Sequence, residues 1–157
     1  KWRMMVWVIT IVVLPLLGGC DKAKISQLVE FKPIEYLNEC SLSIVDPESA
    51  DSYLVINSQE ELTQYILIHE KGENACVKLS EELNIDFSKW TILIGKKRLT
   101  HIQGELIAQS VVKLDKDLIY QVRIKNGGYT AIGQFRFGVL IPKISTGTNV
   151  TFDVQVE

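Results

Sequence analysis

Residues 118–124 read LIYQVRI, and this stretch decides the fold class. Its apolar side chains occupy every second position, a period typical of a β-strand that buries one face. They are Leu118, Tyr120, Val122 and Ile124. The same alternation recurs at residues 90–94, 106–114, 135–141 and 150–156. The sequence therefore predicts about five consecutive strands in its second half.

The polar segments between these strands indicate how the strands are connected. Residues 126–128 are Asn-Gly-Gly, which tolerate positive φ and so predict a hairpin. Residues 115–117, Asp-Lys-Asp, predict a short polar turn. The basic residues 96–98 are expected to close the first strand, and Pro142 suits the end of a later one.

A helix is predicted at residues 58–70, directly after a short apolar strand at residues 52–57. Ser58 and Glu61 have the spacing of a capping box, in which each side chain binds a free N–H group at the start of the helix. The apolar stripe that follows has helical spacing and consists of Leu62, Tyr65, Ile66 and His69. Gly72 supplies the expected stop. A second short helical turn is possible at residues 80–83.

Together these elements predict an α+β domain at residues 32–157: a mostly antiparallel, strongly curled meander sheet with one main helix packed on it. Four apolar residues nevertheless fall on faces that should point outward, namely Ile107, Val111, Ile119 and Leu140. Either the sheet curls into a barrel-like or two-layer form, or part of this face meets a partner. Curling is the preferred interpretation.

The first twenty residues indicate export. A basic start (Lys1-Trp2-Arg3) precedes an uncharged apolar run at residues 6–17, the design of a secretory signal peptide. Pro15 and two glycines end this run before the roughly 20 residues that a membrane-spanning helix needs. Residues 17–20, Leu-Gly-Gly-Cys, resemble a bacterial lipobox. That resemblance implies a signal peptide at residues 1–19 and lipid attached to Cys20.

The resemblance also implies a place in the cell. The chain would be anchored by lipid to a membrane of the bacterial cell envelope, on the outer membrane or a periplasmic face. Residues 20–31 are polar and charged, so they are expected to act as a tether. The 157-residue chain fits one domain, and its 17 basic against 19 acidic side chains give no reason to expect nucleic acid as a partner.

Two cysteines remain besides Cys20. Cys40 and Cys76 form an even pair in a chain expected to mature in a compartment that permits disulfides. Closing a loop of about 37 residues would stabilise the fold by about 3–4 kcal/mol in the chain-entropy description. Two free structural thiols are the alternative. A metal site or a nucleophilic cysteine is less favoured, because no further ligand or base lies at a suitable spacing.

The searches for catalytic motifs find none. The sequence lacks a Gly-x-Ser-x-Gly elbow, a His-Glu-x-x-His helix, a phosphate-binding glycine loop and a Cys-x-x-Cys pair. His69 is expected to offset the helix dipole, and His101 to lie in a loop beside the basic residues 96–98. We therefore predict a protein that is not an enzyme and has no metal or cofactor.

Other residues that might carry chemistry have simpler interpretations. Asp115 and Asp117 could hold a cation, but their context favours a turn. Asn149 opens an Asn-Val-Thr sequon, which in a bacterial protein is better explained as the start of a strand. Trp90 stands beside alternating isoleucines, so it is expected in the core rather than under a sugar.

With the elements placed, the domain resembles the C-terminal domain of the PrcB-like protease-stabilising proteins. The residues that carry the resemblance are VINSQEEL (55–62), IDFSKWTILIG (85–95) and FRFGVLIPK (135–143). It covers about residues 52–156, and residues 126–130 lack the proline-rich loop of the family. The resemblance implies a non-enzymatic lipoprotein that binds or stabilises a secreted or surface protease complex. It assigns no site residue.

The leading hypothesis is therefore a lipid-anchored accessory or binding module of the cell envelope with a protein partner. The alternative is a surface module that binds glycans or serves adhesion through an apolar, aromatic sheet face. A hydrolase that assembles its site from scattered residues ranks third.

Overall fold

Strand β6 (Trp90–Ile102) is the centre of the fold. In the computed structural model, which describes residues 26–44, 50–69 and 74–157, β6 lies in a four-stranded sheet of order β2-β9-β6-β4. Its partners are β9 (Tyr129–Pro142), β4 (Ser52–Ile56) and β2 (Lys32–Pro33). Every pair in this sheet is antiparallel.

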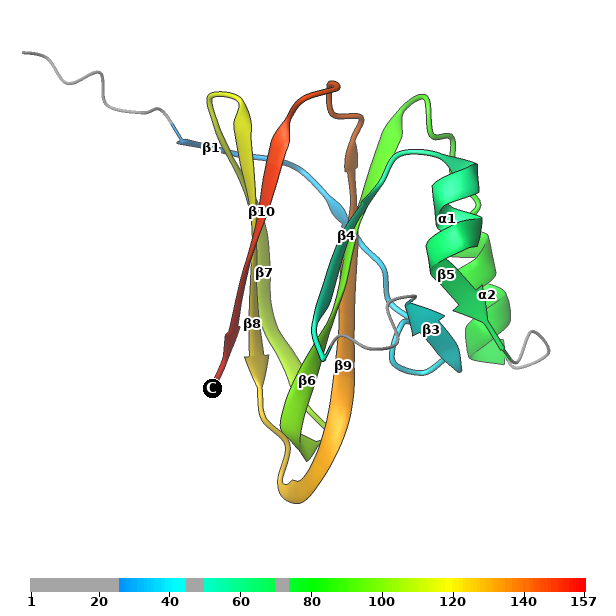
Figure 1. The fold of residues 1–157 in the computed structure, drawn as a ribbon, viewed down its shortest axis with the longest axis vertical. Coiled ribbons are helices and arrows are strands. Elements are labelled where there is room, and N and C mark those ends of the chain that lie inside the picture. Colours follow the sequence, from blue (N-terminus) through cyan, green and yellow to red (C-terminus); the bar gives the residue numbers. More distant parts are fainter. Residues whose placement is uncertain (1–25, 45–49, 70–73) are drawn as a thin grey trace, which may run out of the picture.

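A second four-stranded sheet faces the first (Figure 1). It has the order β1-β7-β8-β10 and is built from β1 (Ser26–Leu28), β7 (Glu105–Leu114), β8 (Asp117–Lys125) and β10 (Asn149–Val156). The C-terminal strand β10 runs parallel to β8, whereas the other pairs are antiparallel. The two sheets form a β-sandwich.

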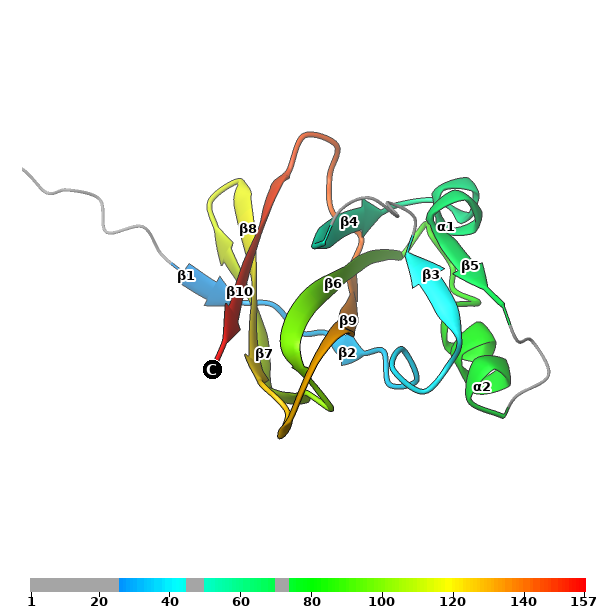
Figure 2. The same ribbon diagram turned by 60° about the horizontal axis from the view of Figure 1, so that its bottom comes forward.

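A third layer covers the other face of the β6 sheet, as the turned view in Figure 2 shows. It contains two helices, α1 (Gln59–Tyr65) and α2 (Asn74–Glu82). A two-stranded sheet completes it, in which β3 (Leu42–Ile44) pairs with β5 (Ile66–Ile68).

The three layers enclose two hydrophobic cores, one on each face of the β6 sheet. Leu93 and its neighbours on β9 face the sandwich, where they pack with Tyr120 and Val122 of β8. Ile92 and Ile94 face the helical layer. Because β6 is buried on both faces, its sequence is a continuous apolar run rather than a clean alternation.

An aromatic cluster closes the sandwich where the edge strands β4 and β10 approach each other. Tyr53 of β4 stacks on Phe152 of β10, with ring centroids 5.3 Å apart. Tyr120 meets Phe152 and Phe137 edge-on at 5.6 and 5.9 Å. The buried Tyr120 hydroxyl donates to Gln109 Oε1 at 2.8 Å, and burial raises the pKa of this phenol.

The predicted α+β fold with one main helix is wrong. Of the described residues, 57% lie in strands and 13% in helices, the sheets are several rather than one strongly curled meander, and there are two helices. The physical reason lies in the pairing. The long strands β6 and β9 pair with each other, although β7 and β8 lie between them in the sequence. β7 and β8 pair in the second sheet instead, so the strands do not follow one another in a single meander.

The predicted hairpin at residues 126–128 is also wrong. These residues carry the chain from β8 to β9, which lie in different sheets and do not pair. The glycine is needed for close approach instead, because a Cβ on Gly127 would lie 1.6 Å from the carbonyl oxygen of Ile102. The short turn at residues 115–117 does form a hairpin, in which Leu114 pairs with Asp117.

The helix predicted at residues 58–70 begins as expected but ends early. Ser58 caps it, its Oγ accepting from the N–H of Glu61 at 3.1 Å, and the Glu61 carboxylate accepts from the N–H of Asn57 at 2.6 Å. At Ile66 the chain becomes β5, because pairing with β3 satisfies its backbone groups. Gly72, the predicted stop, lies outside the described residues. The second helix, α2, is longer than the predicted turn at 80–83.

The four apolar residues that the alternation placed on outward faces differ in how deeply the structure buries them. Val111 and Leu140 are buried in the two cores, and Ile119 is half-buried. Ile107 stays 45% exposed at a register shift between Leu106 and Ala108. A two-layer sandwich with a third layer outside it accounts for the buried ones.

The N-terminal predictions fall largely outside the described residues. Residues 1–25, with the predicted signal peptide and Cys20, are not described. Of the predicted tether, the second part joins the fold, because β1 pairs with β7 and Phe31 packs against the sandwich core. No helix in the described part of the chain is long and apolar enough to span a membrane.

Candidate functional site

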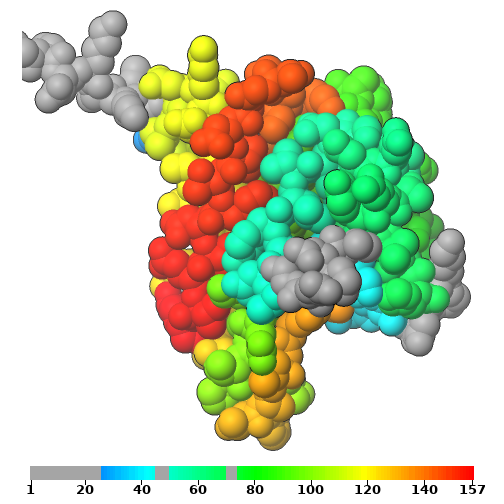
Figure 3. Space-filling model, in the orientation of Figure 1, coloured from blue at the N-terminus to red at the C-terminus, as the bar shows by residue number. Residues whose placement is uncertain are grey.

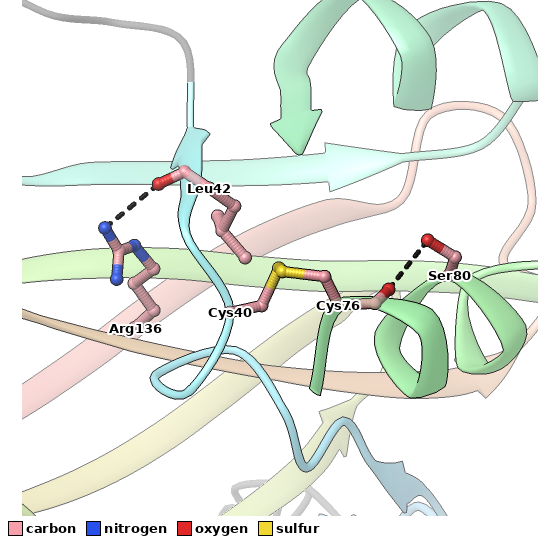
Figure 4. The surroundings of a disulfide bond; sticks show 5 residues. All are labelled: Cys40, Leu42, Cys76, Ser80 and Arg136. Carbon is pink, nitrogen blue, oxygen red and sulfur yellow. Dashed lines mark hydrogen bonds between the residues drawn. A yellow bond between two sulfur atoms is a disulfide. The ribbon is translucent and has the colours of Figure 1, made fainter. Parts of the chain in front are cut away.

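The cysteine pair is structural. Cys40 and Cys76 form a disulfide, with their Cα atoms 4.8 Å apart, and both residues are buried (Figure 4). The bond joins the segment before β3 to helix α2. This confirms the predicted pairing and leaves neither thiol for catalysis or metal binding.

Two basic residues beneath this layer also serve the fold. The guanidinium of Arg136 donates to the carbonyl of Leu42 at 3.0 Å, and burial lowers its pKa (Figure 4). Lys96 is 3% exposed, with its Nζ 3.5 Å from the carbonyl of Ile44. Both therefore tie β3 to the β6 sheet rather than forming an anion site.

The residues singled out from the sequence do not converge on one site. His69 follows β5 instead of ending a helix, and its Nε2 lies 2.7 Å from Ser43 Oγ. His101 is in β6 rather than in a loop, with Nδ1 3.1 Å from Thr100 Oγ1. Trp90 packs against the helical core, as expected, and Lys32 Nζ lies 4.9 Å from its ring centroid.

The basic residues 96–98 are part of β6 and do not end it. Lys97 forms an ion pair with Asp51 at 2.5 Å, and the N–H of Arg98 donates to the same carboxylate at 2.9 Å. Burial raises the pKa of Asp51, but these hydrogen bonds outweigh it and leave that pKa below its ordinary value of 3.8. The single negative charge of Asp51 thus balances one of the three positive charges of the cluster.

The acidic candidates belong to the β7–β8 hairpin, and Asp117 is the first residue of β8. Asp115 lies at positive φ in the β7–β8 hairpin, and Asn149 starts β10 as expected, with its Nδ2 3.5 Å from Asp117 Oδ1. Within the described ranges, no group of three His, Cys, Asp or Glu side chains could hold a metal ion.

The surface that stands out is the far end of β6 and β9. β4 pairs with β6 only as far as Lys96, and β2 pairs with β9 only at Val139 and Leu140. Among the described residues, the two long strands pair only with each other beyond these points. We call residues 99–102 of β6 and 129–133 of β9 the β-arm; it projects at the bottom of Figures 1 and 3.

The tip of the β-arm is apolar and exposed. Ile132 is 68% exposed, Tyr129 64% and Ile102 37%. Large apolar side chains so exposed at a projecting end typically mark a surface that contacts another molecule. The base of the arm, in contrast, is anchored, because Leu99 is buried in the sandwich core.

The outer edge of β9 is covered by a side chain at Arg136 and is open at Gln134, nearer to the β-arm. The amide of Asn38 pairs with both backbone groups of Arg136, at 2.7 and 2.8 Å, as a neighbouring strand would. By the alternation of an antiparallel ladder, the N–H and C=O of Gln134 point the same way. No described strand pairs with β9 there. The arm therefore offers an open backbone edge beside an apolar tip.

The opposite end of the sandwich carries a cavity of about 730 Å³. It lies between the β7–β8 hairpin and the segment 142–148 that leads to β10. Its lining includes Lys113, Lys116 and Lys143, three hydroxyl side chains and Asp115. The two ends of the sandwich thus differ in chemistry.

Sequence reasoning missed both surfaces. One predicted strand began at Trp90 and was closed by the basic residues 96–98, and a later one began at Phe135. Residues 99–102 and 129–133 were therefore taken for connections. One signal was available: Ile102 and Ile132 are apolar residues inside segments expected to be polar loops. The cavity had none, because it depends on how the β7–β8 hairpin and the segment before β10 meet in space.

Comparison with known proteins adds no relative. No protein-family model, curated protein or solved structure matches the chain. The resemblance to the PrcB-like proteins stays a prediction.

Proposed function

We propose that this chain is a non-enzymatic, lipid-anchored binding module of the bacterial cell envelope that holds a protein partner through the β-arm. The observation that carries the proposal is the open backbone edge of β9 beside the exposed Ile132 and Tyr129. The lipobox-like residues 17–20 support the anchor.

The open edge fits a partner segment in extended conformation. Such a segment adds a strand to a sheet: backbone hydrogen bonds supply affinity, and neighbouring side chains supply specificity. Gln134 offers the backbone groups, while Tyr129 and Ile132 offer apolar contacts.

Charge narrows the chemistry of the partner. Arg98 and Lys125 lie exposed at the base of the β-arm, and in the described structure their side-chain cations form no ion pair. Two carboxylates lie at the same end: Glu105 pairs across the sheet with Lys125, and Glu157 forms an ion pair with Arg123. A segment with apolar residues flanked by acidic ones complements this surface. The resemblance to PrcB-like proteins makes a secreted or surface protease complex the first partner to test.

Site-specific photo-crosslinking in living cells tests the proposal. A photoreactive residue replaces Ile132 in the arm or, as the matched control, Leu67, an exposed apolar residue of β5 in the helical layer. We expect a defined protein adduct from position 132 and none from position 67.

A second variant tests the strand-addition mode. Gln134→Pro removes the outward N–H without touching a hydrogen bond between β6 and β9, and leaves Ile132 in place. We expect the adduct at position 132 to fall about tenfold, since several backbone contacts depend on the added strand. Adducts from position 67 alone would refute the β-arm as the binding surface.

The glycan alternative predicts a different result. The sheet aromatics Tyr120, Phe137 and Phe152 are packed between the layers, so a sugar would use a more exposed ring, such as Trp90, Tyr53 or Tyr129. Binding on a glycan array that is lost in Trp90→Ala or Tyr129→Ala, without any protein adduct, would favour that alternative.

A further inference from the structure

We propose that the end of the sandwich opposite the β-arm rests on the membrane surface, and that its cavity takes the phosphate of an anionic phospholipid headgroup. This inference rests on the proposed lipid anchor at Cys20. It adds an orientation and a ligand class that the anchor alone does not require.

The first argument is the length of chain between the anchor and the fold. The first residue that the structure describes, Ser26, lies opposite Leu114, next to the β7–β8 turn. Five residues separate it from Cys20 in the sequence. Fully extended, they hold Ser26 within about 20 Å of the lipid attachment point. The nine-residue β8 alone is about 30 Å long, so the tether is shorter than the domain.

The direction of the strands then sets the orientation. The β7–β8 turn and the connection from β9 to β10 lie together at the top of Figure 1, and the β-arm lies at the bottom. A short tether attached at the top keeps the cavity near the headgroups. The β-arm would then point away from the bilayer, toward a partner.

The second argument is the lining of the cavity. Lys113 and Lys116 reach it from the hairpin, and the ammonium group of neither forms a hydrogen bond or ion pair with any described residue. Lys143 is already engaged, its Nζ 2.8 Å from the carbonyl of Asn57. Asp115 is the one carboxylate of the lining. Two uncommitted ammonium groups are therefore available to an anion.

The rest of the lining suits the neighbouring parts of a phospholipid. The hydroxyl groups of Ser145 and Thr148 lie 3.1 Å apart and bond each other, which uses one of their two protons. The other proton and the hydroxyl of Thr146 can donate to phosphate oxygens. Val29 and Leu118 give the cavity an apolar part that can cover the glycerol and first methylene groups. Lysines close to an anionic leaflet are attracted to its surface charge, and the attraction falls off within a Debye length.

Fluorescence quenching on the full chain, reconstituted in vesicles, tests the orientation. Thr146→Cys labels the cavity end, and Thr130→Cys labels the β-arm as the matched control; both residues are exposed threonines. With Cys40 and Cys76 paired and Cys20 acylated, the new thiol is the only free one. We expect a spin-labelled headgroup to quench a fluorophore at position 146 and leave one at position 130 bright. Equal quenching at both would overturn the orientation.

Charge reversal tests the ligand. In vesicles rich in anionic phospholipid, Lys113→Glu with Lys116→Glu should weaken the membrane contact at position 146 by about tenfold. The control variant Lys78→Glu, an exposed lysine of α2 in the helical layer, should leave it unchanged. Quenching that is the same in purely zwitterionic vesicles and insensitive to both variants would overturn the headgroup site.

Mass spectrometry separates this inference from the proposal on which it rests. A chain without acyl groups at Cys20 removes both the anchor and the orientation. An acylated chain that fails the quenching tests overturns only the orientation and the headgroup site, and leaves the anchored binding module intact.

Discussion

The two cores on either side of the β6 sheet are stabilised in different ways. The sandwich core joins long strands that pair over eight or more residues and closes with four aromatic rings. The helical layer consists of helices of seven and nine residues and strands of three. Elements this short are marginal alone.

The disulfide lies where the elements are shortest. It joins helix α2 to the segment before β3, and the sandwich core has no covalent link among the described residues. Long strands supply their own cooperativity, whereas a layer of short pieces gains from restricting the unfolded chain. The comparison predicts that a cavity in the sandwich core destabilises the whole domain. Loss of the Cys40–Cys76 disulfide is expected to destabilise only the helical layer.

The largest effect is expected from Phe137→Ala in the sandwich core. Phe137 is 2% exposed and contacts the rings of Tyr53 and Tyr120. Losing a buried ring and leaving a cavity should lower the free energy of unfolding by about 3–5 kcal/mol. Denaturant unfolding measures it, with Phe137→Leu as the milder control. A loss confined to the helical layer would contradict the comparison.

Removing the disulfide should lower the free energy of unfolding by slightly less, and the lost protection should be confined to the helical layer. The double variant Cys40→Ser, Cys76→Ser should lose about 3–4 kcal/mol, because a long loop of the unfolded chain is no longer closed. Hydrogen exchange should show α2 and β3 losing protection while β7 and β8 keep theirs. Equal loss in β8 would mean that the two cores are one cooperative unit.

A smaller effect within the helical layer is expected from Ser58→Ala. The Ser58 hydroxyl caps α1, and its loss should cost about 1 kcal/mol. Gln64→Ala, an exposed change on the same helix, serves as the control and should be near neutral. If the two variants are equally stable, the cap contributes nothing to this layer.

The smallest effect is expected at the edge of β6, which both cores share. The pKa of Asp51 is below its ordinary value, so its stabilisation is complete above about pH 4 and is lost as the pH falls through the lowered pKa. Asp51→Asn should lower stability at about pH 6 and abolish this part of the acid sensitivity. Unfolding of both proteins at about pH 6 and about pH 3 checks the sign. If the pH dependence of unfolding is the same in both proteins, Asp51 does not contribute to the acid sensitivity.

Local patterns predicted local structure well. The alternation at residues 118–124 became β8, the Ser58–Glu61 spacing became a helix cap, and Cys40 paired with Cys76. Each of these depends on neighbours in the sequence or on simple counting. The end of the helix at Tyr65 does not, because Ile66 has a better partner in β3, a segment that precedes it by more than twenty residues.

The candidate surfaces were harder to foresee for the same reason. An alternating strand shows which of its faces is apolar but not which strand lies beside it. The β-arm exists because β6 and β9 extend beyond the ends of the neighbouring strands β4 and β2. The cavity exists because the β7–β8 hairpin and the segment before β10 lie side by side. Neither fact is encoded within one segment.

The sequence by itself determined that this chain is rich in strands, that its cysteines suit a disulfide, and that its first residues resemble an export signal. These follow from periodicity, composition and short spacing. The tertiary structure decided that the strands divide into two sheets with a third layer, that β10 runs parallel, and that one end is apolar and the other carries lysines. Such features depend on contacts between distant segments, and burial can favour many pairings of the same alternating strands equally well.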